Sequence, residues 1–546
     1  MDYQSDFLII GSGVAGLMFA IRAADLGSVA VVTKNDVMDS NTRLAQGGIA
    51  SVFDDLDSFD LHMQDTLASG DGLCDPDVVE MVVKNGPDRI RDLIDLGVKF
   101  NLQQNGSTAR EGLEFDLGRE GGHSKKRIVH AEDMTGRELE RVLVEKVKAH
   151  PNIVLFENHI AVDLITQSTR MQRGFVTTTH EEQCCGAYVL DKNTARVKAF
   201  SSRITLLATG GSGKVYLYTS NPDIATGDGV AMGYRAGATL ANLEFVQFHP
   251  TCLYHPEAKN FLISEAVRGD GGILIDQKSR PFMQKYDPLK DLACRDVVAR
   301  AIDRELKKSG AESVFLDISH KPAEVVKKRF PNIYRQCLLY GYDMTREPIP
   351  VVPAAHYMCG GIVTDAVGRT DIKRLYAVGE TACTGLHGAN RLASNSLIEA
   401  LVYAHNAAQQ AAEDLKETAA VNVSPVPVWD EVGSTDSDET IMVSHNWDEI
   451  RRLMWNYVGI VRSDKRLARA KRRIEIIQQE IREYYWNFKV ESELIELRNI
   501  ATVAELIISC ATHRKESRGL HYNIAYPKRD DTRWRKDTIV RRSLLE

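Results

Sequence analysis

The first forty residues show an apolar run, a glycine-rich turn and a segment whose apolar residues have helical spacing. FLII spans residues 7–10, GSGVAG spans 11–16, and LMFAIRAADLG and VAVVTK follow at 17–27 and 29–34. This order predicts a strand, a turn, a helix and a second strand. Gly11, Gly13 and Gly16 would allow a tight turn, close approach of a pyrophosphate and close helix–strand packing. Because the start of the helix would offer free N–H groups to the phosphates, the pattern predicts a dinucleotide site.

Two later apolar segments also run into glycine turns. ITLLATGGSGK occupies residues 204–214 and RLYAVGETA occupies 374–382. We expect both to join the sheet of the first strands, which makes the nucleotide-binding domain discontinuous, at 1–242 and 356–418. The segment 243–355 is then an insertion. Its strand-like runs ILI and VFLDI and its helix-like run CRDVVARAIDREL predict a smaller α+β unit.

The chain changes character after residue 418. Residues 419–445 are rich in Pro, Ser and acids, which predicts a linker. Residues 446–546 contain three segments with helical periodicity, which predict a small helical bundle. The last part, 514–542, carries ten Lys or Arg against four acids. A solvated tail and a tail docked onto the acidic body of the same chain both remain open, and a surface for a partner is the less favoured alternative.

Composition excludes several classes of protein. The 546 residues carry a net charge of -7, which does not favour nucleic-acid binding. The nine cysteines form no CxxC pair, which argues against a zinc ribbon, an iron–sulfur cluster or a dithiol site. The acidic start MDYQSD is unlike a secretory leader, and the uncharged run 7–21 is short for a membrane span. We therefore expect a soluble cytoplasmic protein with no metal site.

One arginine lacks any local partner. Arg391 stands within LHGANRLASNSL, with no acid within four residues on either side. A buried unpaired charge is costly, so this guanidinium needs an anion from elsewhere. That anion is either a distant Asp or Glu or a bound ligand.

Seven motifs occur in order along the chain: GSGVAG, AQGGIA, ATGG, QFHPT, RGDGG, HYMCGG and GANRLASNSL. Together they resemble the fumarate reductase/succinate dehydrogenase flavoprotein superfamily and, within it, most closely the L-aspartate oxidases. The resemblance implies an α/β fold: a Rossmann-like FAD-binding domain, an inserted α+β capping domain over 243–355, and a C-terminal helical bundle.

The resemblance implies FAD contacts along much of the chain. A ribose-binding acid usually ends the second strand, but this chain has Thr33 and Lys34 there, and Lys34 fits the family pattern. Glu380 would accept hydroxyls of the flavin ribitol, although an acid closing a strand at the surface is the plainer alternative. The implied contacts are Ser12, Val14, Ala15, Lys34, Asn41, Thr42, Arg43, Leu44, Ala45, Gln46, Gly47, Gly48, Asp228, Glu380, Ser396 and Leu397.

Asn41 bears on how the flavin is held. Membrane succinate dehydrogenases resemble this chain in SNTRLAQGGIA (40–50), but they carry a histidine at the Asn41 position that bonds covalently to FAD. An amide cannot form that bond, so we expect non-covalent FAD. This argues against a subunit that passes electrons to an iron–sulfur partner.

The resemblance also supplies the anion for Arg391, namely a substrate carboxylate, which a guanidinium matches with two hydrogen bonds. His249 and His356 resemble the family's other carboxylate donors, whereas lone histidines are more often structural. Gln247, Ser264 and Ser394 would complete the substrate pocket.

Arg295 resembles the family's proton-transferring arginine, with Glu265 and Arg268 as the relay towards solvent. Asp296 or Asp303 could instead pair with Arg295 locally. Glu120, in GREGGHS, would favour the ammonium group of aspartate by its charge. A loop acid paired to Arg119 or Lys125 is the alternative for this residue.

The implied activity is FAD-dependent oxidation of L-aspartate to iminoaspartate with oxygen or fumarate as acceptor, the first step of NAD biosynthesis. A soluble fumarate reductase or a dehydrogenase flavoprotein subunit is the alternative. A flavin-binding tRNA-modification or structural protein is less favoured, since it would need a basic groove. Expected partners are a small dicarboxylate and, transiently, quinolinate synthase, with no nucleic acid, membrane or iron–sulfur subunit.

Overall fold

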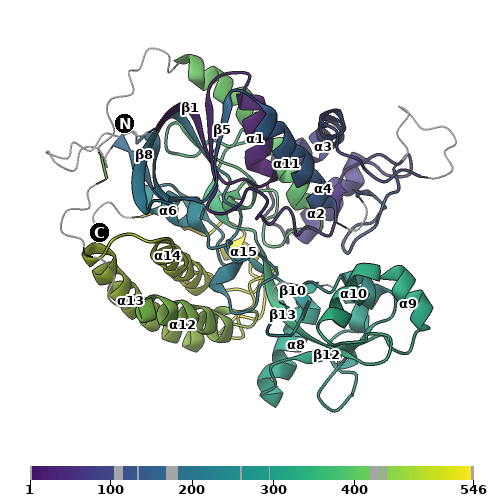
Figure 1. Ribbon diagram of the computed structural model, residues 1–546. Coiled ribbons are helices and arrows are strands. Elements are labelled where there is room, and N and C mark those ends of the chain that lie inside the picture. The colour runs from purple at the N-terminus through teal and green to yellow at the C-terminus, as the bar shows by residue number, and fades with distance from the viewer. Residues whose placement is uncertain are drawn as a thin grey trace.

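The structure is a computed structural model that describes residues 3–103, 115–131, 134–167, 182–258, 261–293, 295–417, 428–429, 435 and 440–542 (Figure 1). Most of the predicted linker at 419–445 therefore lies outside the described residues. Its last part is helical, because α12 begins at Thr440. The predicted end of the linker at residue 445 is wrong by about one helical turn and a half.

A seven-stranded sheet forms the centre of the described part of the chain. Its order is β5 (Ile153–Phe156), β2 (Val29–Val32), β1 (Tyr3–Ile10), β8 (Arg196–Leu207), β7 (Cys184–Asp191) and β6 (His159–Thr166), and β15 (Leu375–Ala377) pairs with β8. β1 runs parallel to both β2 and β8, and β15 runs parallel to β8. The expectation that segments 204–214 and 374–382 join the sheet of the first strands is confirmed.

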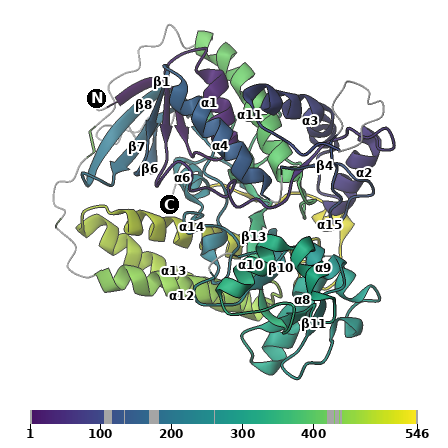
Figure 2. The ribbon, with the colours of Figure 1, turned by 45° about the vertical axis from the view of Figure 1, so that its right-hand side comes forward.

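Both faces of β1 are buried, so its apolar run does not alternate with polar residues. Phe7 and Ile9 pack on one face with α1 (Val14–Ala23), α4 (Thr135–Ala149) and α11 (Asn395–Glu417). Leu8 and Ile10 pack on the other face, towards α6 (Asp228–Ala236) and the C-terminal helices. Figures 1 and 2 show the first group of helices side by side over the sheet.

The middle of the chain builds a second sheet with its own apolar core. Its order is β10 (Val246–Leu253), β13 (Ile349–Met358), β12 (Val314–Asp317) and β11 (Ile273–Ile275). Helices α8 (Arg295–Ser309), α9 (Ala323–Arg329) and α10 (Pro331–Leu339) accompany it. The strands predicted at ILI and VFLDI and the helix predicted at CRDVVARAIDREL are confirmed. The start of β10 and the end of β13 reach back to the main body, where Phe248 and Met358 join the larger core.

Helices α12 (Thr440–Val458), α13 (Asp464–Asn487) and α14 (Ser492–His513) lie together below the main sheet in Figure 2. The predicted helical character of this region is confirmed. Among the residues that the structure describes, no helix combines the length and the apolar character that a membrane span needs.

The basic tail is docked onto the same chain. Strand β17 (Ile539–Val540) pairs antiparallel with β9 (Leu240–Ala241) of the main body. Arg514 is fully buried and donates to Glu244 at 2.6 Å and to Glu516 at 2.9 Å. Because a buried charge needs such partners, these contacts fix the tail in place, and the solvated-tail interpretation is wrong for this segment.

Candidate active site

A cavity of about 600 Å³ lies where the carboxyl ends of β1, β2 and β8 meet the ends of β10 and β13. Most of the predicted cofactor and substrate residues line it. Four predicted residues do not: Gly16, Arg43, Gln247 and Arg268. Gly16 instead allows α1 to lie close against the turn, since an added Cβ would lie 2.1 Å from the Gly11 carbonyl oxygen. Arg43 is exposed, and the other two are buried behind the residues that line the cavity.

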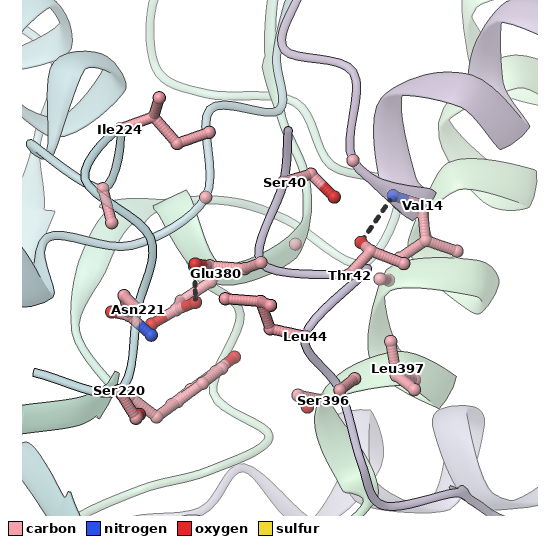
Figure 3. Close-up of a pocket in the computed structure, with 18 of the residues that line it drawn as sticks. Val14, Ser40, Thr42, Leu44, Ser220, Asn221, Ile224, Glu380, Ser396 and Leu397 are labelled. Atoms are coloured by element: carbon pink, nitrogen blue, oxygen red, sulfur yellow. Dashed lines mark hydrogen bonds between the residues drawn. The ribbon is translucent and has the colours of Figure 1, made fainter. Parts of the chain in front are cut away.

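The glycine turn leaves the first turn of α1 open to the cavity. Gly11 has a φ of 116°, and an added Cβ would lie 2.1 Å from the Ala208 carbonyl oxygen, so only glycine fits this turn. The N-cap Gly13 provides no side-chain cap for α1. The Val14 N–H donates to Thr42 Oγ1 at 3.0 Å, as Figure 3 shows. Apart from this one bond, the side chains leave the N–H groups of the first helical turn free, which fits the pyrophosphate of a dinucleotide.

Lys34, at the end of β2, lies between two carboxylates. Its Nζ donates to Asp228 Oδ2 at 2.8 Å and to Glu496 Oε1 at 2.6 Å. Burial disfavours the charged form of Lys34, but the two carboxylates outweigh burial and raise its pKa. Asn499 Nδ2 donates to the other Asp228 oxygen at 2.8 Å. Glu496 and Asn499 belong to α14, and sequence reasoning missed both because nothing near them in the chain indicates a cofactor.

Glu380 and Asn41 meet at another part of the cavity wall. Glu380 accepts the Met358 N–H at 3.0 Å and the Asn41 Nδ2 at 3.3 Å. Burial raises the pKa of Glu380 to about 7. The Asn41 Oδ1 is buried and has no partner among the described residues. A ligand that brings hydroxyl donors fits both groups, as the ribitol chain of FAD would. The surface-acid interpretation of Glu380 is wrong, since this carboxylate points into the cavity shown in Figure 3.

Sequence reasoning also missed a polar loop on this wall. Ser220, Asn221 and Ile224 line the cavity, and Figure 3 shows Asn221 nearest to Glu380 among them. The Asn221 Nδ2 donates to the His356 carbonyl oxygen at 3.1 Å. The run of small polar residues just before Asp228 was the only sequence feature that could have indicated this loop.

Arg391 is buried, and no acid in the described part of the chain pairs with it. Its Nη2 and Nε donate to Gln247 Oε1 at 3.1 and 3.3 Å, and its Nη1 donates to Ser396 Oγ at 2.8 Å. The ring centre of Tyr357 lies 4.3 Å from the guanidinium carbon. No carboxylate of the described residues forms an ion pair with Arg391, so the distant-acid interpretation is wrong. The site therefore presents a positive charge that an anionic ligand can neutralise.

Two histidines face the same part of the cavity. The rings of His249 and His356 have centroids 5.6 Å apart. Burial, then Arg295 and His356, lower the pKa of His249 well below its usual value. Burial, then Arg391 and Arg295, do the same for His356. The Nδ1 of His249 accepts the Thr251 N–H at 3.2 Å, which leaves Nε2–H as a neutral donor suited to a carboxylate.

Arg295 pairs with Glu265 and with neither acid of its own helix. Its Nε donates to Glu265 Oε2 at 2.5 Å, while Arg268 Nη2 lies 3.4 Å from Glu265 Oε1. Asp296 pairs instead with Arg300 at 2.6 Å, and Asp303 pairs with Lys307 at 2.8 Å. The local-pair interpretation of Arg295 is wrong. Glu265 follows Ser264, the N-cap of α7 (Glu265–Gly269), and both line the cavity.

Glu120 also lines the cavity. Its Oε2 accepts a hydrogen bond from the Ser394 hydroxyl at 2.7 Å. Burial disfavours the charge of Arg295, but the carboxylates of Glu265 and Glu120 outweigh burial and raise the pKa of Arg295. Arg119 donates its Nε to the His123 carbonyl oxygen at 2.9 Å instead. Among the described residues, neither Arg119 nor Lys125 forms an ion pair with Glu120, so the loop-pair interpretation is wrong for this structure.

Comparison with known proteins agrees with this geometry. A family model described as FAD binding domain matches residues 6–397, and one described as fumarate reductase flavoprotein C-term matches 447–544. The chain is 53% identical over 523 residues to L-aspartate oxidase 1 of Ralstonia nicotianae, covering 96% of each chain. It is 50% identical over 525 residues to the L-aspartate oxidase of Pseudomonas aeruginosa, again covering 96% of each.

A solved structure of E. coli quinol fumarate reductase FrdA superposes with a TM-score of 0.86 at 31% identity, covering 100% of this chain and 95% of that chain. The FAD-binding match and the open glycine turn together identify FAD as the cofactor. The chain belongs to the L-aspartate oxidase family, within the fumarate reductase flavoproteins.

Proposed function

We propose that this chain oxidises L-aspartate to iminoaspartate at a non-covalently bound FAD, with oxygen or fumarate as the final acceptor. The observation that carries the proposal is Arg391, a buried guanidinium with no acidic partner among the described residues, beside neutral His249 and His356 in the same cavity as the glycine turn. The names of the relatives support aspartate as the substrate. The reaction would open NAD biosynthesis.

The clamp would hold a four-carbon diacid by both ends. Arg391 would take one carboxylate, because Gln247 and Ser396 fix its guanidinium while leaving its charge uncompensated. His249 and His356 would donate to a carboxylate as neutral imidazoles. Neutral donors suit this place because Arg391 and Arg295 already supply the positive charge of the pocket.

The substrate Cα would lose a hydride, which is the chemistry that FAD supplies when bound, and the substrate nitrogen would lose a proton to solvent as the C=N bond of iminoaspartate forms. Glu120 would favour aspartate over succinate, since its carboxylate sits at the cavity wall where an ammonium group could approach. When fumarate is the acceptor, a proton must reach the substrate carbon. Arg295, which donates to Glu265, would deliver this proton, and Arg268, whose Nη2 lies 3.4 Å from Glu265 Oε1, would complete the relay.

The insertion at 243–355 would act as a capping domain, since His249 and His356 lie at its two junctions with the FAD-binding part. The cytoplasmic location and a transient contact with quinolinate synthase stay predictions. The first rests on the composition of the sequence, and the second rests on the instability of an imine in water, which favours rapid transfer to the next enzyme.

Anaerobic mixing of the purified yellow protein with L-aspartate tests the function directly. We expect the flavin absorbance to bleach with aspartate and to return when oxygen or fumarate is added. Bleaching by succinate but not by aspartate would contradict the proposal and favour a succinate dehydrogenase or fumarate reductase flavoprotein.

A further inference from the structure

Tyr357 lies directly against the Arg391 guanidinium. It follows His356 on β13, it lines the cavity, and only 6% of it is exposed. The 4.3 Å between the guanidinium carbon and the ring centre is within the range in which an aromatic face attracts a cation. The other contacts of the guanidinium are the neutral oxygens of Gln247 and Ser396. Of these three contacts, the ring of Tyr357 covers the largest part of the guanidinium and therefore does most to fix its orientation.

A buried carboxylate holds the far end of the tyrosine. The Tyr357 hydroxyl donates to Glu399 Oε2 at 3.2 Å and lies 3.1 Å from His387 Nε2. The same Glu399 oxygen lies 2.9 Å from His387 Nε2, and the Thr384 hydroxyl donates to the other oxygen at 2.6 Å. Glu399 is 1% exposed and belongs to α11. The phenol is thus tied to a rigid helix rather than to a loop.

This arrangement strengthens the contact with Arg391 in two ways. The hydrogen bond from the phenol to Glu399 Oε2 holds the hydroxyl end of the ring in place. It also draws the hydroxyl proton towards the carboxylate, which leaves more electron density on the ring face that attracts the guanidinium. The carboxylate of Glu399 does not contact Arg391 itself, so the guanidinium keeps its charge for a ligand.

We propose that Tyr357 is a positioning residue for the Arg391 clamp and that Glu399 acts on Arg391 through the phenol ring. Tyr357 orients the guanidinium towards the cavity and stabilises its buried charge without neutralising it as a direct ion pair would. The inference rests on the proposed function only in that Arg391 binds a carboxylate.

The test measures succinate binding to the FAD-loaded protein by the change in flavin absorbance, so it needs no turnover. Tyr357→Leu removes the ring, Tyr357→Phe removes only the hydroxyl, and Glu399→Gln removes only the charge. We expect the succinate Kd to rise roughly 2- to 30-fold in the leucine variant. The phenylalanine and glutamine variants should show a smaller rise in the same direction. FAD content should stay at the level of the unmodified protein in all three.

A matched pair elsewhere in the chain provides the control. Tyr376 is fully buried and donates its hydroxyl to Asp414, and neither residue lines the cavity. Tyr376→Phe and Asp414→Asn therefore remove the same kind of contact at a distance from the clamp. Both should leave the succinate Kd unchanged.

A double-mutant cycle separates positioning from general packing. In the Arg391→Leu background, Tyr357→Leu should weaken succinate binding no further, because its effect passes through the guanidinium. An equal loss in both backgrounds would overturn the proposal, and so would an unchanged Kd in Tyr357→Leu. If aspartate fails to bleach the flavin while the succinate results hold, the proposed function fails and the positioning role stands.

Discussion

The Ser394 hydroxyl donates a 2.7 Å hydrogen bond to Glu120 Oε2, joining two residues that are 274 positions apart in the chain. Ser394 adopts a φ of 59°, a left-handed conformation that is unfavourable for serine and needs support from its surroundings. The bond links the segment that carries Arg391 to the loop that carries Glu120. The residue proposed to recognise the ammonium and the residue proposed to bind a carboxylate are therefore held by one local framework.

Glu120→Gln should separate aspartate from the other diacids. The amide keeps the size of the side chain and can still accept from Ser394, but it lacks the charge that would attract an ammonium. We expect aspartate oxidation to fall at least tenfold, about 1.4 kcal/mol, while dye-linked fumarate reduction is largely kept. Both activities are measured on one preparation.

Ser394→Ala serves as the companion variant, since it removes the hydrogen bond and keeps the acid. It should reduce aspartate oxidation less than Glu120→Gln does. An equal fall of both activities in Glu120→Gln would mean that this residue only shapes its loop.

Arg391→Leu should weaken the use of aspartate and of fumarate together. Removing one partner of a buried charge-assisted pair costs on the order of 2–5 kcal/mol in binding. FAD content should be normal, because the guanidinium touches only one of the implied FAD contacts, Ser396, and the others stay in place. Arg369→Leu, at an exposed arginine paired with Asp365, is the control and should change neither activity. Loss of flavin in Arg391→Leu would instead indicate a structural role.

Acid precipitation should release all of the yellow colour into the supernatant. The reason is Asn41, whose amide lines the cavity beside Glu380 and cannot bond covalently to the flavin. The measurement is the flavin absorbance of the supernatant and of the washed pellet. Colour retained in the pellet would show a covalent bond elsewhere on the chain.

Glu380→Gln should stabilise the flavin-free protein at neutral pH more than at acidic pH. Burial raises the pKa of Glu380 to about 7, above its value near 4.5 in an unfolded chain. Between these pH values the unfolded chain loses a proton that the folded chain keeps, so rising pH destabilises the folded state. The difference in Tm between the variant and the unmodified protein should therefore be small near pH 4.5 and reach its maximum above pH 7.

The stability difference behind that change is on the order of 3 kcal/mol at most. Thermal unfolding of both flavin-free proteins across this range provides the measurement. Comparing the two proteins at each pH also cancels the titration of Glu140, whose pKa burial likewise raises to about 7. A constant difference across the range would show that Glu380 is ionised at all these pH values.

Local pattern was enough to predict much of the fold. The glycine turn at 11–16, four of the parallel strands of the main sheet, the two strands at ILI and VFLDI and the helices after residue 440 follow from spacing within a few residues, whereas β5, β10 and β13 were not predicted. The open start of α1 is also determined locally. The turn before it needs a glycine at position 11, and the sequence shows that glycine directly. The family motifs then named about half of the residues that line the cavity.

The partners of the charged residues were decided by tertiary structure alone. Lys34 bonds Glu496, 462 positions away, and Arg514 bonds Glu244, 270 positions away. Whether Arg391 had a distant acid stayed open until the fold placed Gln247 and Tyr357 around it. Strand and helix periodicity depends on neighbouring residues, which the sequence displays. The pairing of a buried charge depends instead on which distant segments pack together. A charge that has lost its water must form hydrogen bonds with the donors or acceptors that the fold places beside it.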